Sequence, residues 1–329
     1  MFTKEMSVKE ILADPEIQEF VPGMVVNWDI SKNYPYYDLP LEEAYQKEGG
    51  WNYESLLSGM NKLLAEKRKG NGLIQLYTDE EIQADPKKAE AKMVWFPSDD
   101  PKASEKPYII VVPGGGYVNV WNISEGYPIA AHFNQLGFHA FILTYRVVGP
   151  KLLPAPTEDF AQALKVIKNH QEYFGVQWDN YLATGFSAGA HLISTWGMDN
   201  HGYSTYGMPK PAALFPIYAP ISWKLCLEDE DHDGFAISAL GMTVKEAAAS
   251  DWNIDEHVEN FPPSYIVCTE DDELVNPEHS RRLKRALDAA GVPAELEIGA
   301  RGHHGFGEGR DADTWGWIER AAAFYEKVK

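Results

Sequence analysis

The sequence predicts an α/β fold, in which helices cover both faces of a mostly parallel central sheet, preceded by an N-terminal helical extension. From about residue 91, short apolar runs rich in β-branched residues alternate with amphipathic stretches of helical period. The first 85 residues differ, because a capping box at Ser7–Glu10 and an apolar stripe at 56–64 indicate helices. The length of 329 residues suffices for one large α/β domain plus such an extension. We therefore predict an extension, 1–85, and a main domain, 86–329.

The candidate strands are residues 93–96, 108–112, 140–145, 181–184, 212–218, 265–269 and 294–298. Between them, one amphipathic stretch passes through Ile129 and Phe133, and another through Phe160 and Leu164, which predicts helices there. A further helix is expected to begin at Asn276, since Asn caps helices and Pro suits the first helical position. These alternating elements imply right-handed crossovers between parallel strands.

A Gly-Phe-Ser-Ala-Gly sequence, residues 185–189, lies between a candidate strand and a candidate helix. In this context G-x-S-x-G describes a nucleophile elbow, a tight turn that exposes a serine hydroxyl at its tip. Gly185 and Gly189 lack the side chains that would clash in such a turn. The N–H of Ala188 points toward the same space at the helix N-terminus. Ser187 is therefore the candidate nucleophile, and Ala188 a candidate oxyanion donor.

The run at 108–112 ends in Pro113-Gly114-Gly115-Gly116. Consecutive glycines let the backbone approach a ligand closely with its N–H groups turned inward. We predict that the amides of Gly115 and Gly116 complete the oxyanion site with Ala188. A flexible glycine turn without a function is the alternative.

The remaining two groups of a serine triad are an acid after the nucleophile and a late histidine. The loop after 265–269 contains several carboxylates, of which we favour Asp272, because Asp-x-x-Val fits a loop that turns back into the sheet. Asp271 is the alternative. After the last strand, two adjacent histidines cannot point the same way in an extended loop. We favour His304, which Gly-Phe-Gly follows, over His303.

Composition limits the possible partners. The net charge of −20 argues against nucleic acid, anionic membrane surfaces and polyanionic substrates, and leaves neutral or cationic small molecules open. The charged first twenty residues contain no apolar signal region, and no segment approaches a membrane span, so we expect a cytoplasmic protein. Two cysteines, Cys226 and Cys268, do not suggest a disulfide framework. The oligomeric state stays open.

An aromatic stretch interrupts the helical pattern of the extension. It contains Trp28, Tyr34, Tyr36, Tyr37 and Trp51. We favour packing of the extension onto the main domain. A wall of the acyl or sugar pocket is the alternative, since flat rings suit the apolar faces of neutral sugars. The sequence also leaves open whether the extension covers the active site.

An acidic run at 229–234 matches the start of a calcium loop through Asp229, Asp231 and Asp233. The twelfth position would be Leu240, where such a loop requires a bidentate Glu. We therefore expect an acidic surface loop, and we predict neither a metal ion nor a cofactor.

The Gly-Gly-Gly-Tyr loop, the Gly-Phe-Ser-Ala-Gly elbow, the Asp-Asp-Glu-Leu-Val loop and the His-Gly-Phe-Gly end resemble the α/β-hydrolase esterase/lipase family. Its chain order of nucleophile, acid and base is matched here by Ser187, Asp272 and His304. The pattern is most similar to bacterial carbohydrate acetyl esterases, feruloyl-type esterases and hormone-sensitive-lipase-like enzymes. The resemblance covers about 91–329. Pro113 departs from the family's usual His and removes a side chain that braces the loop.

This resemblance implies a serine carboxylic ester hydrolase that acts on short-chain acyl esters, above all acetyl esters, of small molecules such as xylo-oligosaccharides. A prolyl-oligopeptidase-like serine peptidase is one alternative, but such enzymes usually carry a large N-terminal propeller, for which 85 residues are too few. A non-catalytic binding protein of the hydrolase fold is the other. It would have a broken triad or a blocked oxyanion loop, and here only the His at position 113 is missing.

Overall fold

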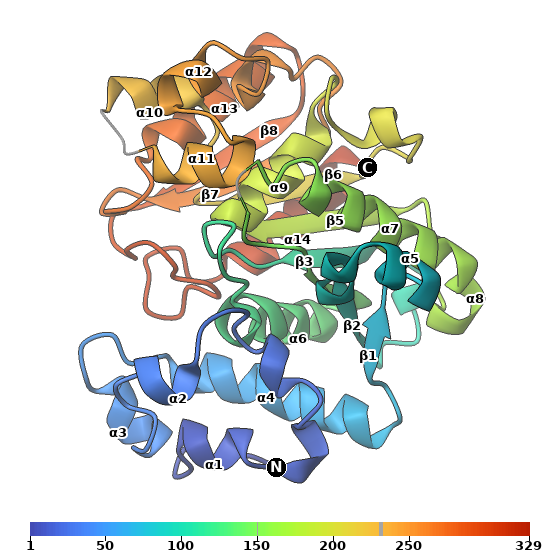
Figure 1. The fold of residues 1–329 in the computed structure, drawn as a ribbon, viewed down its shortest axis with the longest axis vertical. Helices are drawn as coiled ribbons and strands as arrows, with labels where there is room; N and C mark the ends of the chain where they lie inside the picture. The colour runs from blue at the N-terminus through green and yellow to red at the C-terminus, as the bar shows by residue number, and fades with distance from the viewer. Residues whose placement is uncertain (150, 230–232) are drawn as a thin grey trace.

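An eight-stranded sheet forms the centre of the computed structural model, which describes residues 1–149, 151–229 and 233–329 (Figure 1). The strands lie in the order β1-β2-β4-β3-β5-β6-β7-β8. β2 is antiparallel to both of its neighbours, and every pair from β4 to β8 is parallel, so the predicted mostly parallel sheet is confirmed. The strands are β1 Leu73–Gln75, β2 Lys92–Phe96, β3 Tyr108–Val112, β4 Ala140–Thr144, β5 Tyr181–Phe186, β6 Ala213–Ile217, β7 Ser264–Thr269 and β8 Ala294–Gly299.

Helices surround the sheet and form most of the N-terminal extension. They are α1 Val8–Leu12, α2 Ile30–Asn33, α3 Leu41–Tyr45, α4 Tyr53–Arg68, α5 Asp79–Ala84, α6 Tyr127–Gln135, α7 Ala155–Asn169, α8 Gln171–Phe174, α9 Ala188–Gly197, α10 Trp223–Glu228, α11 Gly234–Leu240, α12 Val244–Ala248, α13 Glu278–Ala289 and α14 Trp317–Val328. Within the described ranges, no helix is long and apolar enough to cross a membrane.

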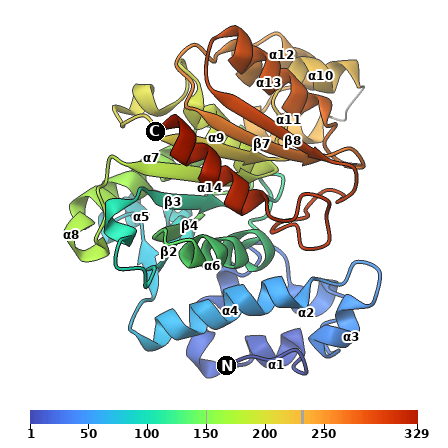
Figure 2. The same cartoon turned by 180° about the vertical axis from the view of Figure 1, so that it is seen from behind.

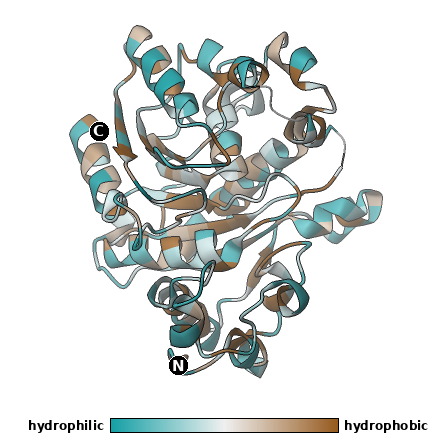
Figure 3. Cartoon of the chain, turned by 90° about the vertical axis from the view of Figure 1, so that its left-hand side faces the viewer, coloured by the Kyte–Doolittle hydropathy of each residue, from teal (hydrophilic) through white to brown (hydrophobic). Residues whose placement is uncertain are grey.

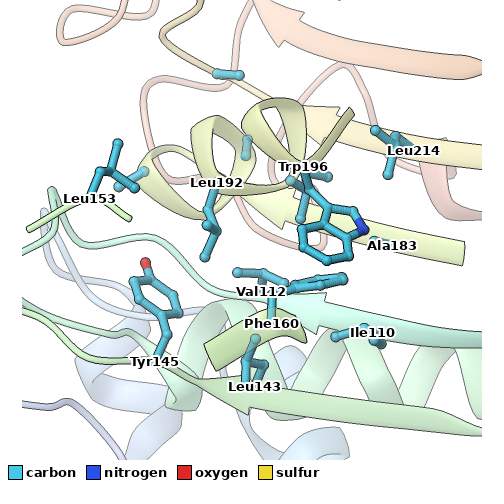
Figure 4. Packing of buried hydrophobic residues seen from close by; sticks show 14 of the residues in the cluster. Ile110, Val112, Leu143, Tyr145, Leu153, Phe160, Ala183, Leu192, Trp196 and Leu214 are labelled. Carbon is cyan, nitrogen blue, oxygen red and sulfur yellow. The ribbon is translucent and has the colours of Figure 1, made fainter. Parts of the chain in front are cut away.

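Both faces of the sheet are buried, which explains why the strands read as continuous apolar runs. All five residues of β3 are buried. Ile110 and Val112 belong to one buried cluster with Phe160 of α7 and Leu192 of α9 (Figure 4). Ile109 belongs to a second cluster on the opposite face, which α6 and α14 cover. In Figure 3 the central strands are accordingly the most hydrophobic part of the fold.

The extension packs against the outer side of α6, as the views from front and back both show (Figures 1 and 2). Met60 and Leu63 of α4 lie in the same buried cluster as Ile129 of α6. The helices approach closely at Gly59, where a Cβ would lie 2.5 Å from the backbone N of Pro128. Only glycine therefore allows this close contact of α4 with α6. The first 85 residues also contain β1 and α5.

The extension also holds the long loop that follows β8. Asn52, the N-cap of α4, donates from Nδ2 to Asp311 over 2.8 Å, and the Ser55 hydroxyl donates to Glu308 over 2.5 Å. Loop 302–312 contains no helix or strand, so its conformation depends on such contacts. The extension thus helps to position the loop that carries the candidate base.

A partly buried ion-pair network connects this loop to α6. His132 Nδ1 lies 2.7 Å from Glu308 Oε1, and His132 Nε2 lies 3.0 Å from Glu319 Oε1. Burial by itself would lower the pKa of His132, but the two carboxylates outweigh it and raise this pKa above its usual 6.5. The charged imidazole is therefore favoured between the two carboxylates.

We expect Gly59→Ala to lower the free energy of unfolding. The added methyl group would meet backbone atoms of Pro128 and Tyr127, which cannot move without shifting α6. Overpacking of this kind costs about 1–3 kcal/mol, which should exceed the gain of about 1 kcal/mol in helix propensity. Urea denaturation measures the difference. Gly23→Ala is the matched control, because a Cβ there has no atom within 4 Å. Equal effects of the two changes would contradict the prediction.

The His132 network predicts a stability that depends on pH. The pKa of His132 is higher in the folded state than in the unfolded state. Its contribution to the free energy of unfolding is therefore complete below pH 6.5 and is lost as pH rises through the folded-state pKa. We expect His132→Gln to flatten the decline of unfolding free energy above pH 6.5. His170→Gln, which removes an exposed imidazole, should leave the decline unchanged. Urea denaturation across the alkaline range tests this, and identical curves for wild type and His132→Gln would refute it.

Candidate active site

Ser187 occupies the sharp turn between β5 and α9, with φ 50° and ψ −119°. A non-glycine residue with positive φ is strained, and strain of this kind is typical of a nucleophile elbow. A Cβ at Gly185 would lie 2.4 Å from the carbonyl oxygen of Gly189, and one at Gly189 would lie 2.1 Å from that of Val112. Gly185 is thus required by the close packing within the elbow, and Gly189 by the packing of the elbow against the end of β3, as the sequence motif predicts.

The structure brings Ser187, His304 and Asp272 into one chain of hydrogen bonds. His304 Nε2 lies 2.9 Å from Ser187 Oγ, and His304 Nδ1 lies 2.8 Å from Asp272 Oδ2. The Asp272 side chain is fully buried, and its Oδ1 also accepts the N–H groups of Leu274 and Val275. An ionised carboxylate only accepts, so the imidazole proton lies on Nδ1 and leaves Nε2 to accept from the serine hydroxyl.

The alternative acid and base point elsewhere. The His303 side chain is 76% exposed, and its Nδ1 lies 3.7 Å from Asp271 and 3.6 Å from Glu273. Asp271 Oδ1 accepts the backbone N–H of His303 over 3.0 Å. These two residues therefore hold the loop, while their neighbours Asp272 and His304 reach Ser187.

The glycine loop lies beside the serine. Gly115 and Gly116 have φ of 133° and 62°, and both line the same cavity as Ser187. The carbonyl oxygen of Gly115 accepts the N–H groups of Val118 and Asn119, which closes the turn. Among the described residues, the amides of Gly115, Gly116 and Ala188 have no hydrogen-bond acceptor. Three N–H groups near Ser187 are thus available to a ligand.

Glu125 is a site residue that the sequence analysis missed. It lies in a π-helical turn, Asn122–Gly126, and is only 6% exposed. Its Oε2 accepts the N–H of Gly114 over 2.7 Å, and its Oε1 accepts the Tyr218 hydroxyl over 2.8 Å. The Tyr218 oxygen in turn accepts the N–H of Gly307, in the loop of His304. Burial raises the pKa of Glu125, although these two donors oppose that shift.

One carboxylate thus connects the glycine loop with the loop of the base. The resemblance led us to expect a His at position 113 that braces the glycine loop. Glu125, which lies 12 residues later, braces the loop instead. A single Glu before a helix carries no recognisable signal in the sequence. In the sequence, the absence of a His at position 113 was the only indication that another side chain should brace the glycine loop.

The cavity above Ser187 has a volume of about 840 Å³. Its far wall consists largely of apolar side chains from the segment between β6 and β7, including Trp223, Phe235 and Val244. On the side of the extension, Trp51 and Trp121 line it. The structure thus divides the aromatic stretch of the extension, because Trp51 reaches the cavity and the other four residues do not line it.

A second histidine, His279, lies in the cavity wall, but it is no second base. Its Nδ1 accepts the N–H groups of Ile221 and Ser222, both over 3.1 Å, so the ring proton lies on Nε2. Burial lowers its pKa to about 4, which keeps the imidazole neutral at neutral pH. Nε2 lies 3.8 Å from Cys226 Sγ. His279 therefore presents a fixed donor within the wall.

The described part of the chain contains no group of three or more His, Cys, Asp or Glu side chains that could hold a metal ion. Asp231, in the calcium-loop pattern, lies outside the described residues. The side chain of Asp229 accepts from Asn276 over 2.7 Å, and that of Asp233 accepts the N–H of Val244 over 2.7 Å. Both are accounted for by contacts within the fold.

Known proteins share this arrangement of elements. An acetylxylan esterase of Xylanibacter ruminicola is 29% identical over 234 residues, which cover 68% of this chain and 45% of that protein, so the chain spans less than half of its length. The crystal structure of an acetyl ester-xyloside bifunctional hydrolase from Caldicellulosiruptor lactoaceticus aligns with a TM-score of 0.65 at 28% identity, over 78% of this chain and 96% of that one.

An α/β-hydrolase enzyme from a Medee basin deep-sea metagenome library aligns with a TM-score of 0.60 at 20% identity, over 78% of this chain and 97% of that one. Together with the sheet order, this likeness confirms the α/β-hydrolase fold. Both of the named relatives are described as enzymes that act on esters. A family model described as BD-FAE matches residues 96–287, which is more than half of the 329 residues. The chain therefore belongs to the BD-FAE family.

Proposed function

We propose that this chain hydrolyses carboxylic esters through an acyl-enzyme on Ser187, with His304 as general base and acid. Asp272 orients the imidazole and stabilises its charged form. The observation that carries the proposal is the unbroken hydrogen-bond chain from Asp272 through His304 to Ser187, with distances of 2.8 and 2.9 Å. Ser187 and His304 line a cavity together with Gly115 and Gly116, whose amides have no acceptor within the described residues.

The reaction takes place in two steps. As Ser187 Oγ bonds to the acyl carbon, its proton passes to His304 Nε2, and the carbonyl oxygen becomes an oxyanion. The oxyanion collapses, the bond to the alcohol oxygen breaks, and His304 returns the proton to the departing alcohol. Water then attacks the acyl-enzyme with His304 as base, which releases the carboxylic acid and restores Ser187.

The amides of Gly115, Gly116 and Ala188 are the proposed donors to the oxyanion. Each such donor contributes about 3–4 kcal/mol to stabilising the transition state when it is held in place beforehand. Glu125 holds the glycine donors in place, because its carboxylate accepts the N–H of Gly114, the residue that precedes Gly115 and Gly116. We propose Glu125 as a positioning residue, since it acts through the loop rather than on the ester.

The proposed substrates are short-chain acyl esters, above all acetyl esters, of neutral oligosaccharides. Acetylated xylose-containing compounds are supported by the similarity to an acetylxylan esterase and to an acetyl ester-xyloside bifunctional hydrolase. The net charge of −20 favours neutral or cationic small molecules over nucleic acids and other polyanions. The apolar and aromatic lining of the cavity suits a substrate with few charges. No observation favours a peptidase or a non-catalytic binding protein.

Substitutions in the triad test the proposal. We expect Ser187→Ala to lower kcat for p-nitrophenyl acetate by about 10⁶-fold, and Asp272→Asn to lower it by roughly 10⁴-fold. Circular dichroism should be unchanged in both variants. Asp271→Asn and His303→Ala are matched controls, since their side chains point away from Ser187. A larger loss in either control than in Asp272→Asn or His304→Ala would reverse the assignment.

Glu125→Gln tests the brace of the glycine loop. The amide is isosteric but has one oxygen, so it cannot accept from both Gly114 and Tyr218. We expect kcat to fall by about 10–100-fold with little change in KM, because the loop acts mainly on the transition state. Glu256→Gln, which changes an exposed carboxylate that pairs with Lys224 and does not line the cavity, is the control. A loss expressed only in KM would assign Glu125 to ground-state binding instead.

A further inference from the structure

A second cleft of about 390 Å³ also borders His304. Residues 49–56 of the extension form one wall, and the loop 302–312 forms the other. The two clefts share Trp51, Ser124, His304 and Gly305. They are therefore neighbouring compartments that meet at the imidazole. In Figures 1 and 2, the loop after β8 hangs beside the helices of the extension in both views.

The position of this cleft relative to the chemistry indicates what it would bind. Ser187, Gly115 and Gly116 line only the main cavity, so the acyl carbon and its oxyanion belong there. The departing oxygen must lie next to His304 Nε2 to receive its proton. A compartment that contacts His304, but neither the nucleophile nor the glycine loop, lies on the path of the leaving alcohol.

The lining of the cleft combines a flat aromatic ring with polar groups. The Trp51 indole is stacked on Tyr34, with ring centroids 4.1 Å apart and planes within 10°, which fixes its orientation. Asp311 accepts from Tyr45 and Asn52, and a carboxylate can accept about four hydrogen bonds. Asn52 Nδ2 carries a second N–H. A rigid ring beside unused donors and acceptors suits a pyranose ring with its apolar face and its hydroxyl groups.

We propose that this cleft is a binding subsite for the neutral sugar on the alcohol side of the ester, with Trp51 as its stacking platform and Asp311 and Asn52 as hydrogen-bonding groups. This inference rests on the proposed function and adds the location of the alcohol. It gives the extension a direct role in substrate selection. The family-model match starts at residue 96, so the residues of this platform lie outside it.

The experiment compares two esters of the same acid. Acetate release from acetylated xylotriose and from ethyl acetate is followed by titration, in wild type, Trp51→Ala and Tyr37→Ala. Both esters undergo the same chemical step, but only the sugar ester can fill the second cleft. We expect the ratio of kcat/KM for the sugar ester over that for ethyl acetate to fall at least tenfold in Trp51→Ala. Tyr37, an aromatic residue of the extension that lines neither cleft, is the control, and its variant should keep the wild-type ratio.

If Trp51→Ala leaves the ratio of kcat/KM values unchanged, the proposed subsite is wrong. This holds whether the activity of the variant falls equally on both esters or does not fall at all. An equal fall would mean that Trp51 only supports the loop of His304. If wild type hydrolyses neither ester, the proposed function fails. The subsite is then tested separately by measuring the binding of a sugar that carries no ester. Calorimetric titration with unacetylated xylotriose should show binding to wild type and its loss in Trp51→Ala. Absence of binding to wild type would refute the subsite as well.

Discussion

The position of His304 depends on contacts between its loop and the rest of the fold. No helix or strand orders residues 302–312, so side chains must do so. Glu308 is the most important of these, because its carboxylate meets His132 of α6, Ser55 of α4 and Arg310 within the loop. The N-terminal extension therefore helps to position His304, although it contributes no side chain to the hydrogen-bonded chain of Ser187, His304 and Asp272.

The same loop is fixed at a second point, where Gly307 donates to Tyr218 and Tyr218 donates to Glu125. Glu125 also accepts the N–H of Gly114, so one buried carboxylate holds both the glycine loop and, through Tyr218, the loop of His304. A displacement of the glycine loop would therefore also shift the loop of His304, and the reverse. A buried carboxylate destabilises the fold when it is left unpaired, and here Gly114 and Tyr218 donate to both oxygens of Glu125.

The fold, and the proximity of Ser187, His304 and Asp272, could be predicted because their signals are local. The elbow needs glycines two residues before and after Ser187, and Asp272 turns back through the N–H groups of the residues that follow it. Adjacent histidines point to different sides, and the Gly-Phe-Gly that follows His304 favoured it over His303. Glu125, Glu308 and the orientation of Trp51 could not be predicted in this way. Their partners are distant in the sequence, and no spacing rule connects them.

The close contact at Gly59 has a consequence for how such enzymes diversify. A helix can pack on α6 as closely as α4 does only if it has glycine at the position of Gly59, where the two helices meet. A graft of a different N-terminal segment would exchange the wall around Trp51 without touching Ser187. To keep the base in place, however, the new segment would have to supply counterparts of Asn52 and Ser55 for Asp311 and Glu308. Recombination at this boundary is thus constrained to segments that carry both a small residue and two polar ones at matching positions.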